Sequence, residues 1–137
     1  MTPQPGVRDF AERYTAAWCS HDAARVATFF SPNGSLTIND GWPASGREAI
    51  AQAAQEFMTA FPDLQVLMDN VVVQGESAEY HWTLLGTNTG PGGTGCRVCI
   101  SGFEEWQFDA KGLIVRSLGH FDAADYQRQL ERGAAPK

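Results

Sequence analysis

One glutamate of this 137-residue chain lies in surroundings that favour chemistry. The sequence predicts a β-strand from Val98 to Phe108, and side chains alternate between the two faces of a strand. One face then carries Ile100, Gly102, Glu104, Trp106 and Phe108. A carboxylate on an otherwise apolar face is costly to keep ionised, so we expect the pKa of Glu104 to be raised. The pattern thereby predicts a carboxyl group that stays protonated and can donate a hydrogen bond.

A histidine and an aspartate end the next predicted strand, which runs from Leu113 to Asp122. His120 near a carboxylate is suited to moving a proton close to neutral pH, with the acid setting its tautomer. Each residue also has a structural interpretation. Asp122 is a good N-cap for a helix over residues 123–132, with Asp125 in its favourable first turn. His120 can equally be a hydrogen-bonded residue at a strand end.

Several further side chains are candidates for the same site. Tyr14 lies on a predicted helix and is either a hydrogen-bond donor to substrate or a core aromatic with its hydroxyl satisfied. We expect four aromatic residues to line a substrate cavity: Trp18, Trp82, Trp106 and Phe108. Glu104 has an alternative role as an ion-pair partner of Arg97 or Arg116 across the sheet. His81 follows the opposite alternation to Trp82, and we expect it to be structural or solvent-facing.

The elements that position these residues follow from hydrophobic periodicity. Helices are predicted from Gly6 to about Trp18, from Asp22 to near Phe30, from a Ser45–Glu48 capping box to Phe61, and from Ala123 to Arg132. A turn is predicted at 31–34, and strands at 35–39, 64–68, 71–73, 79–87, 98–108 and 113–122. Helices first and consecutive strands later are typical of an α+β protein with a mostly antiparallel sheet, and a long twisted sheet curls around helices.

Composition narrows the function classes. With 137 residues and 43% hydrophobic residues, we expect one domain spanning 1–137, with a core over about 7–132. The net charge of −6 argues against nucleic-acid binding. No apolar run reaches membrane-spanning length. The opening Met1–Gly6 lacks a basic segment followed by an apolar one, and three cysteines cannot all pair within one chain, so we expect a cytoplasmic protein.

Two motifs of the sequence bear on metal and nucleotide binding, and neither predicts such a site. Cys96-x-x-Cys99 is a single pair, whereas a zinc site needs about four ligands. The glycine-rich loop from Thr89 to Gly95 leads into a strand and lacks the Gly-Lys-Ser/Thr of a phosphate-binding loop. We therefore expect no metal and no cofactor.

Trp82, the Gly86-Thr87-Asn88-Thr89-Gly90 segment, Gly102, the turn 108–112, Asp122 and Gln129-Leu130 together resemble the SnoaL-like polyketide cyclases. These belong to the nuclear transport factor 2-like group of cone-shaped, cystatin-like α+β proteins, and the resemblance covers about Val7 to Leu130. It implies that Asp122 is the acid/base group of an intramolecular aldol closure. Asn88 stands where a histidine is common in the cyclases.

The ketosteroid isomerases offer a second, more distant resemblance, through Arg13-Tyr14 and Gly46-Arg47-Glu48. It implies that Tyr14 and Glu104 occupy the places of that family's two oxyanion donors, a tyrosine and a protonated acid. The isomerase base corresponds to Ile38, which cannot accept a proton.

The leading hypothesis is therefore a cofactor-free acid/base enzyme of cyclase, isomerase or dehydratase type, acting on a small apolar ring substrate that contains a carbonyl. Asp122 and His120 move the proton, and Glu104 or Tyr14 stabilises the enolate. The alternatives are a non-catalytic module that binds a small apolar ligand, and a structural dimer whose cone is filled. In each case we expect a homodimer, because the outer face of the sheet carries apolar residues that one chain cannot cover.

Overall fold

The computed structural model describes residues 6–134. The four helices in this range are α1 (Val7–Cys19), α2 (Ala23–Ala27), α3 (Arg47–Ala60) and α4 (Ala123–Arg132). Its six strands are β1 (Phe30–Ile38), β2 (Ala44–Ser45), β3 (Gln65–Gln74), β4 (Ser77–Thr87), β5 (Arg97–Phe108) and β6 (Ile114–Phe121). The expectations about the opening segment and about a domain of 1–137 include residues 1–5 and 135–137, which lie outside the described residues.

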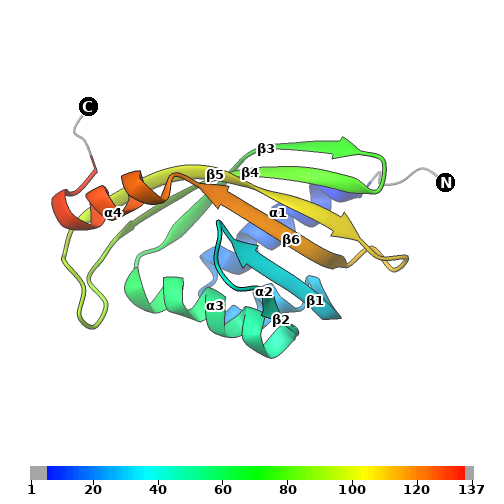
Figure 1. Ribbon diagram of the computed structural model, residues 1–137, viewed down its shortest axis with the longest axis horizontal. Coiled ribbons are helices and arrows are strands. Elements are labelled where there is room, and N and C mark those ends of the chain that lie inside the picture. The colour runs from blue at the N-terminus through cyan, green and yellow to red at the C-terminus, as the bar shows by residue number, and fades with distance from the viewer. Residues whose placement is uncertain (1–5, 135–137) are drawn as a thin grey trace.

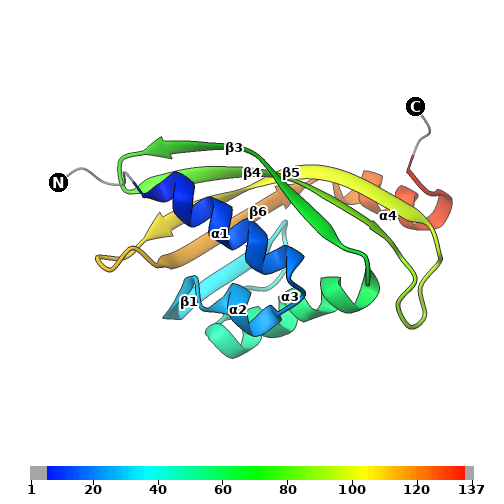
Figure 2. The ribbon, with the colours of Figure 1, turned by 180° about the vertical axis from the view of Figure 1, so that it is seen from behind.

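The strands form one open sheet in the order β2-β1-β6-β5-β4-β3. Every neighbouring pair is antiparallel except β1 with β6, which is parallel. The sheet curves toward α1, α2 and α3, which lie together on one of its faces, while α4 lies at one end (Figure 1 and Figure 2). The predicted fold class, an α+β protein with a curved, mostly antiparallel sheet around N-terminal helices, is confirmed.

The helices bury the stripes that their sequences predict. In α1, Phe10, Tyr14 and Trp18 recur every four residues and are all buried. In α3, Ile50, Ala54 and Met58 are buried, and the helix ends just before Pro62, which cannot continue a helical hydrogen-bond pattern.

Helix α4 lies beside the part of β5 that does not pair with β6. Gln129 of α4 accepts a hydrogen bond from the Cys99 amide at 2.7 Å and donates one to the Cys99 carbonyl at 3.1 Å. Its side chain therefore satisfies a strand residue whose backbone would otherwise lack a neighbour on this side.

Two local predictions are wrong. The segment 31–34 is not a separate turn but part of β1, where the pairing with β6 shifts register between Phe30 and Ser35. The capping box is not formed either, because Ser45 belongs to the short strand β2 and α3 begins after Gly46, at φ 88°, without a side-chain cap bond. At the second place, Ser45 pairs with Ser35 of β1, and this extended pairing overrides the local preference for a cap.

Within residues 6–134, no helix combines the length and the apolar character that crossing a bilayer requires.

Candidate functional site

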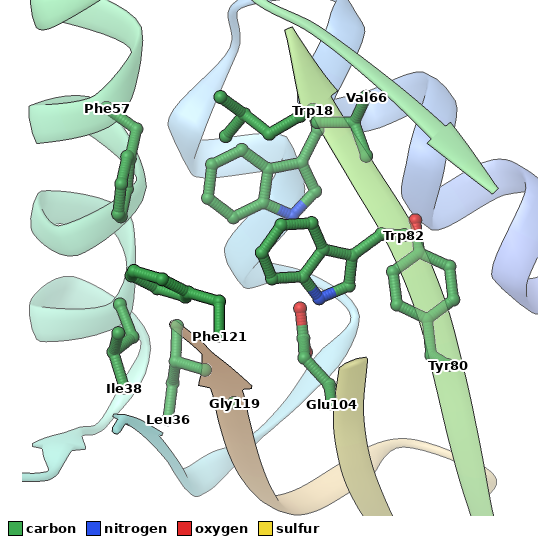
Figure 3. Close-up of a pocket in the computed structure, with 11 residues that line it drawn as sticks. Trp18, Leu36, Ile38, Phe57, Val66, Tyr80, Trp82, Glu104, Gly119 and Phe121 are labelled. Carbon is green, nitrogen blue, oxygen red and sulfur yellow. The ribbon is translucent and has the colours of Figure 1, made fainter. Parts of the chain in front are cut away.

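A cavity of about 60 Å³ lies between the inner face of the sheet and the helices (Figure 3). It is lined by Trp18, Leu36, Ile38, Phe57, Val66, Tyr80, Trp82, Leu84, Glu104, Gly119 and Phe121. These residues come from α1, α3 and five of the strands, so the cavity depends on the whole fold. Most of the lining is aromatic or aliphatic, and Glu104 is the one carboxyl group in it.

Three hydrogen-bond donors fix the position of the Glu104 carboxyl group. Its Oε1 atom accepts hydrogen bonds from Trp106 Nε1 at 2.8 Å, Ser117 Oγ at 2.7 Å and the Tyr14 hydroxyl at 3.1 Å. The Tyr14 hydroxyl also lies 3.2 Å from Oε2. Because the indole N–H can only donate, Oε1 must act as an acceptor, and a proton on this carboxyl therefore belongs on Oε2.

The protonation of Glu104 is set by two opposing effects. Its side chain is buried, and this burial raises the pKa of the carboxyl above 4.5. The hydrogen bonds from Trp106, Ser117 and Tyr14 stabilise the charged form and offset part of this rise in pKa. The alternative of an ion pair with Arg97 or Arg116 is not realised, since the partners of Glu104 are these three uncharged donors. Glu104 is thus a carboxyl group with a raised pKa beside an apolar space.

Tyr14 supports Glu104 and does not line the cavity. It is fully buried on α1, and burial, followed by the nearby charge of Glu104, holds the pKa of its hydroxyl well above 10. Tyr14 and Glu104, the two residues that the resemblance to the isomerases singles out as oxyanion donors, are in direct contact. The hydroxyl proton is directed to the carboxyl, so Tyr14 orients Glu104.

The four predicted lining aromatics divide into two pairs. Trp18 and Trp82 line the cavity (Figure 3). The placement of Trp106 and Phe108 needs correction, because neither is among the lining residues. Trp106 is fully buried, stacked on Tyr80 with ring centroids 4.7 Å apart, and Phe108 packs further along the core against Phe10.

His120 lies on the opposite face of the sheet from the cavity. It pairs across the strands with Phe103, whereas Glu104 pairs with Gly119, so His120 projects outward. Its Nε2 atom lies 2.6 Å from Glu105 Oε2, and both side chains are about half exposed. The expected contact of His120 with a cavity acid is therefore corrected to an outer-face pair with Glu105. His81 lies on the same outer face, bonded to Glu79.

Asp122 caps a helix. Its carboxylate accepts a hydrogen bond from the Asp125 amide at the start of α4, at 3.0 Å, and the residue is exposed. Of the two interpretations drawn from the sequence, the structure shows the N-cap. The expected relay between Asp122 and His120 does not form, since each has a different partner outside the cavity.

The two positions at which the sequence departs from the related families have distinct surroundings. Asn88 is buried and stabilises the loop after β4, donating to the Ala60 carbonyl and accepting from the Thr94 amide. Ile38 lines the cavity, so the place of the isomerase base is filled by an aliphatic side chain.

Sequence reasoning missed Ser117 and Phe121. Both share the inner face of β6, where Ser117 pairs with Trp106 and Phe121 with Gly102. The pairing of β5 and β6 would have identified Ser117 as a neighbour of the carboxyl. A register shift between Gln107 and Phe108 breaks the simple count from the turn.

This architecture, an open curved sheet with α1 and α3 on one face, is the fold of solved structures described as ketosteroid isomerase-like and NTF2-like. The sequence pattern of the SnoaL-like domain matches residues 11–117, and the chain belongs to that family. No curated protein sequence matches the chain significantly.

Solved structures share the fold at low sequence identity. A protein described as a SnoaL-like polyketide cyclase from Jannaschia sp. CCS1 is 17% identical with a TM-score of 0.84, over 99% of this chain and 97% of that one. A ketosteroid isomerase-like protein from Catenulispora acidiphila, in complex with trimethylamine, is 15% identical with a TM-score of 0.78, over 94% and 93%. SalBIII, an epoxide hydrolase/cyclase-like enzyme of pyran ring formation in salinomycin, is 16% identical with a TM-score of 0.78, over 91% and 97%.

Proposed function

We propose that this protein is a cofactor-free acid/base enzyme that acts on a small apolar ring substrate containing a carbonyl group. The observation that carries the proposal is Glu104, a buried carboxyl with a raised pKa at the wall of an aromatic cavity. Protein carboxyls that are desolvated and fixed by hydrogen bonds are suited to proton transfer. Structural neighbours described as a SnoaL-like polyketide cyclase and as an epoxide hydrolase/cyclase-like enzyme share this fold.

The mechanism follows from the two oxygens of Glu104. Oε1 accepts hydrogen bonds from Trp106 and Ser117, whereas Oε2 shares with Oε1 the longer bond from Tyr14, and in this proposal Oε2 exchanges a proton with the substrate. As a carboxylate, Glu104 takes a proton from the carbon next to the carbonyl and leaves an enolate. As the resulting acid, it returns that proton, either to another carbon of the same molecule or to the alkoxide formed when the enolate attacks a second carbonyl. The first outcome is an isomerisation and the second a ring closure.

In this proposal Tyr14 is a positioning residue, and His120 and Asp122 are outside the reaction. Tyr14 donates to the carboxyl, which it orients through both oxygens. His120 is bonded to Glu105 on the outer face, and Asp122 to the start of α4. The proton-transfer roles that the sequence predicts for His120 and Asp122 are tested by the same experiment as the role of Glu104.

Hydrogen exchange next to a carbonyl tests the proposal without knowledge of the natural substrate. In D₂O, the wild-type protein should accelerate deuterium incorporation at the two carbons flanking the carbonyl of cyclohexanone, followed by NMR. Glu104→Gln should abolish the acceleration, because an amide keeps the shape and loses the transferable proton. His120→Gln and Asp122→Asn serve as matched controls and should exchange as fast as wild type. Equal rates for wild type and Glu104→Gln would refute the proposal.

A second candidate function is non-catalytic binding of a small apolar ligand. It is favoured by Ile38, which fills the place of the isomerase base, and by the location of His120 and Asp122 away from the cavity. The Catenulispora neighbour in complex with trimethylamine shows that a small molecule is held by a protein of this fold. Binding of cyclohexanone without any Glu104-dependent exchange would support this function over catalysis.

We also propose that the protein forms a homodimer through the outer face of the sheet. Leu67 and Val72 of β3 are 48% and 36% exposed, and they pair with Thr83 and Glu79 on the face turned away from the helices. Exposed apolar side chains on one sheet face favour contact with a second copy. Sedimentation velocity should show a dimer, and Leu67→Lys should shift it toward the monomer. The proposal is contradicted if the wild-type protein sediments as a monomer both at high concentration and after 100-fold dilution.

A further inference from the structure

The indole nitrogen of Trp82 has no hydrogen-bond partner. Nε1 of Trp82 is buried, and nothing within residues 6–134 accepts a hydrogen bond from it. Buried N–H groups are nearly always paired in folded proteins, with protein, water or ligand. Trp82 lines the cavity, and in Figure 3 its nitrogen faces the carboxyl of Glu104. Because this donor lies at the wall of the cavity, a ligand held there can supply its acceptor.

The direction of this N–H group is fixed by packing. The ring of Trp82 lies over Gly102, where an added Cβ would come within 2.8 Å of Trp82 Cζ2 and 2.2 Å of the His120 carbonyl oxygen. On another side, Phe121 packs against the indole edge-on, with ring centroids 6.0 Å apart. The indole therefore lies in its slot with its donor already aimed, which lowers the entropy lost on binding.

The type of acceptor follows from the other polar groups nearby. An indole nitrogen only donates, so the ligand atom that meets it must be an acceptor. A neutral carbonyl oxygen fits this donor, and its neighbouring carbon then lies in the same cavity as the carboxylate of Glu104 that takes the proton. An ammonium ion would place its own donors against the indole N–H, and a ligand carboxylate would be repelled by the ionised form of Glu104.

We propose that Trp82 is a specificity-determining residue and that the substrate is a neutral molecule whose carbonyl oxygen accepts a hydrogen bond from the Trp82 indole N–H, beside Glu104. The apolar body of this molecule lies against Trp18, Phe57 and Phe121. This inference rests on the proposed function, and it adds the atom by which the substrate is recognised and the residue that recognises it.

The test compares two probes that differ in one group, cyclohexanone and methylenecyclohexane, in which CH₂ replaces the oxygen. The ¹⁵N-labelled protein has four tryptophans and hence four indole N–H signals, and Trp82→Phe identifies one of them by its loss. Cyclohexanone should shift the Trp82 signal downfield, and methylenecyclohexane should not. In Trp82→Phe the dissociation constant for cyclohexanone should rise about tenfold, while that for methylenecyclohexane stays within about twofold. Trp18→Phe, the matched control, should change both constants by a similar factor.

The outcomes separate this inference from the proposed function. An unmoved Trp82 signal, equal weakening of both probes in Trp82→Phe, or no binding of cyclohexanone would overturn the inference. The signal shift is measured on the wild-type protein, so it decides even where Trp82→Phe folds poorly. Failure of Glu104-dependent deuterium exchange removes the catalytic proposal, whereas the response of Trp82 decides how a ligand oxygen is held.

Discussion

Replacing Glu104 by alanine should destabilise the protein strongly, whereas replacing it by glutamine should change its stability little. Alanine removes the acceptor of Trp106 Nε1, Ser117 Oγ and the Tyr14 hydroxyl together. A buried donor left unsatisfied costs about 1–3 kcal/mol, so three of them predict a loss of about 3 kcal/mol or more. That is a large part of the 5–15 kcal/mol typical of a domain. Glutamine keeps an oxygen at the Oε1 position, and at acid pH its stability should lie within about 1 kcal/mol of wild type.

The pH dependence of stability isolates the charge of Glu104. Its pKa is raised in the folded state above 4.5, so the folded protein binds more protons than the unfolded chain as pH rises from 4.5 to the folded value. Wild-type stability should therefore fall over this window, by about 1.4 kcal/mol for each unit by which the pKa is raised. Glu104→Gln has no such group, and its advantage over wild type should grow with pH and then level off.

Urea unfolding followed by tryptophan fluorescence, repeated in steps from pH 4 to pH 8, measures both effects. The reasoning is refuted if Glu104→Ala is as stable as Glu104→Gln, because the three donors would then not depend on the carboxyl. It is refuted equally if the difference between wild type and Glu104→Gln is the same at every pH, because burial would then not raise the pKa of Glu104.

Three further predictions concern the surroundings of the carboxyl. Asp122→Ala should lower stability by about 1 kcal/mol because the helix cap is lost, whereas Asp122→Asn should not. Deuterium exchange should be normal in both variants. Loss of exchange in Asp122→Asn would instead support a catalytic role for Asp122. His120→Ala removes a half-exposed pair with Glu105 and should change the free energy of unfolding by less than about 1 kcal/mol; a larger loss by urea unfolding would contradict this. Gly119→Ala should be tolerated, since an added Cβ would lie 3.8 Å from Glu104 Cγ, whereas Gly119→Leu should fill the cavity and abolish cyclohexanone binding by NMR. Undiminished binding in Gly119→Leu would place the ligand elsewhere.

The sequence was most informative where one periodicity runs unbroken. Along β5 the alternation from Ile100 to Trp106 is intact, so the inward direction of Glu104 was correctly predicted. The spacing of Phe10, Tyr14 and Trp18 likewise placed Tyr14 on the buried face of α1. The meeting of Tyr14 and Glu104 then followed from the resemblance to the isomerases, because no periodicity relates residues 90 positions apart.

The prediction was wrong where the pleat is interrupted. In β6, Ile114 and Ser117 are both buried although they are three residues apart, so a period-two count along the strand fails. This break decides that Phe121 faces the cavity and His120 faces away. Asp122 follows the strand at the start of α4, where the backbone turns and the strand alternation ends. The sequence therefore predicted that His120 and Asp122 act together, whereas in the structure each has a different partner.

The environment of Glu104 is better explained by function than by stability. An apolar residue of similar volume among Trp106, Tyr80 and Phe30 would avoid the burial of a carboxyl, and such replacements are often neutral or stabilising when the polar partners are replaced as well. The fold instead gives Oε1 two donors of its own, Trp106 and Ser117, whereas Oε2 has the Tyr14 hydroxyl that it shares with Oε1. This asymmetry suits proton transfer at Oε2, because it fixes the carboxyl plane and leaves Oε2 the less occupied oxygen.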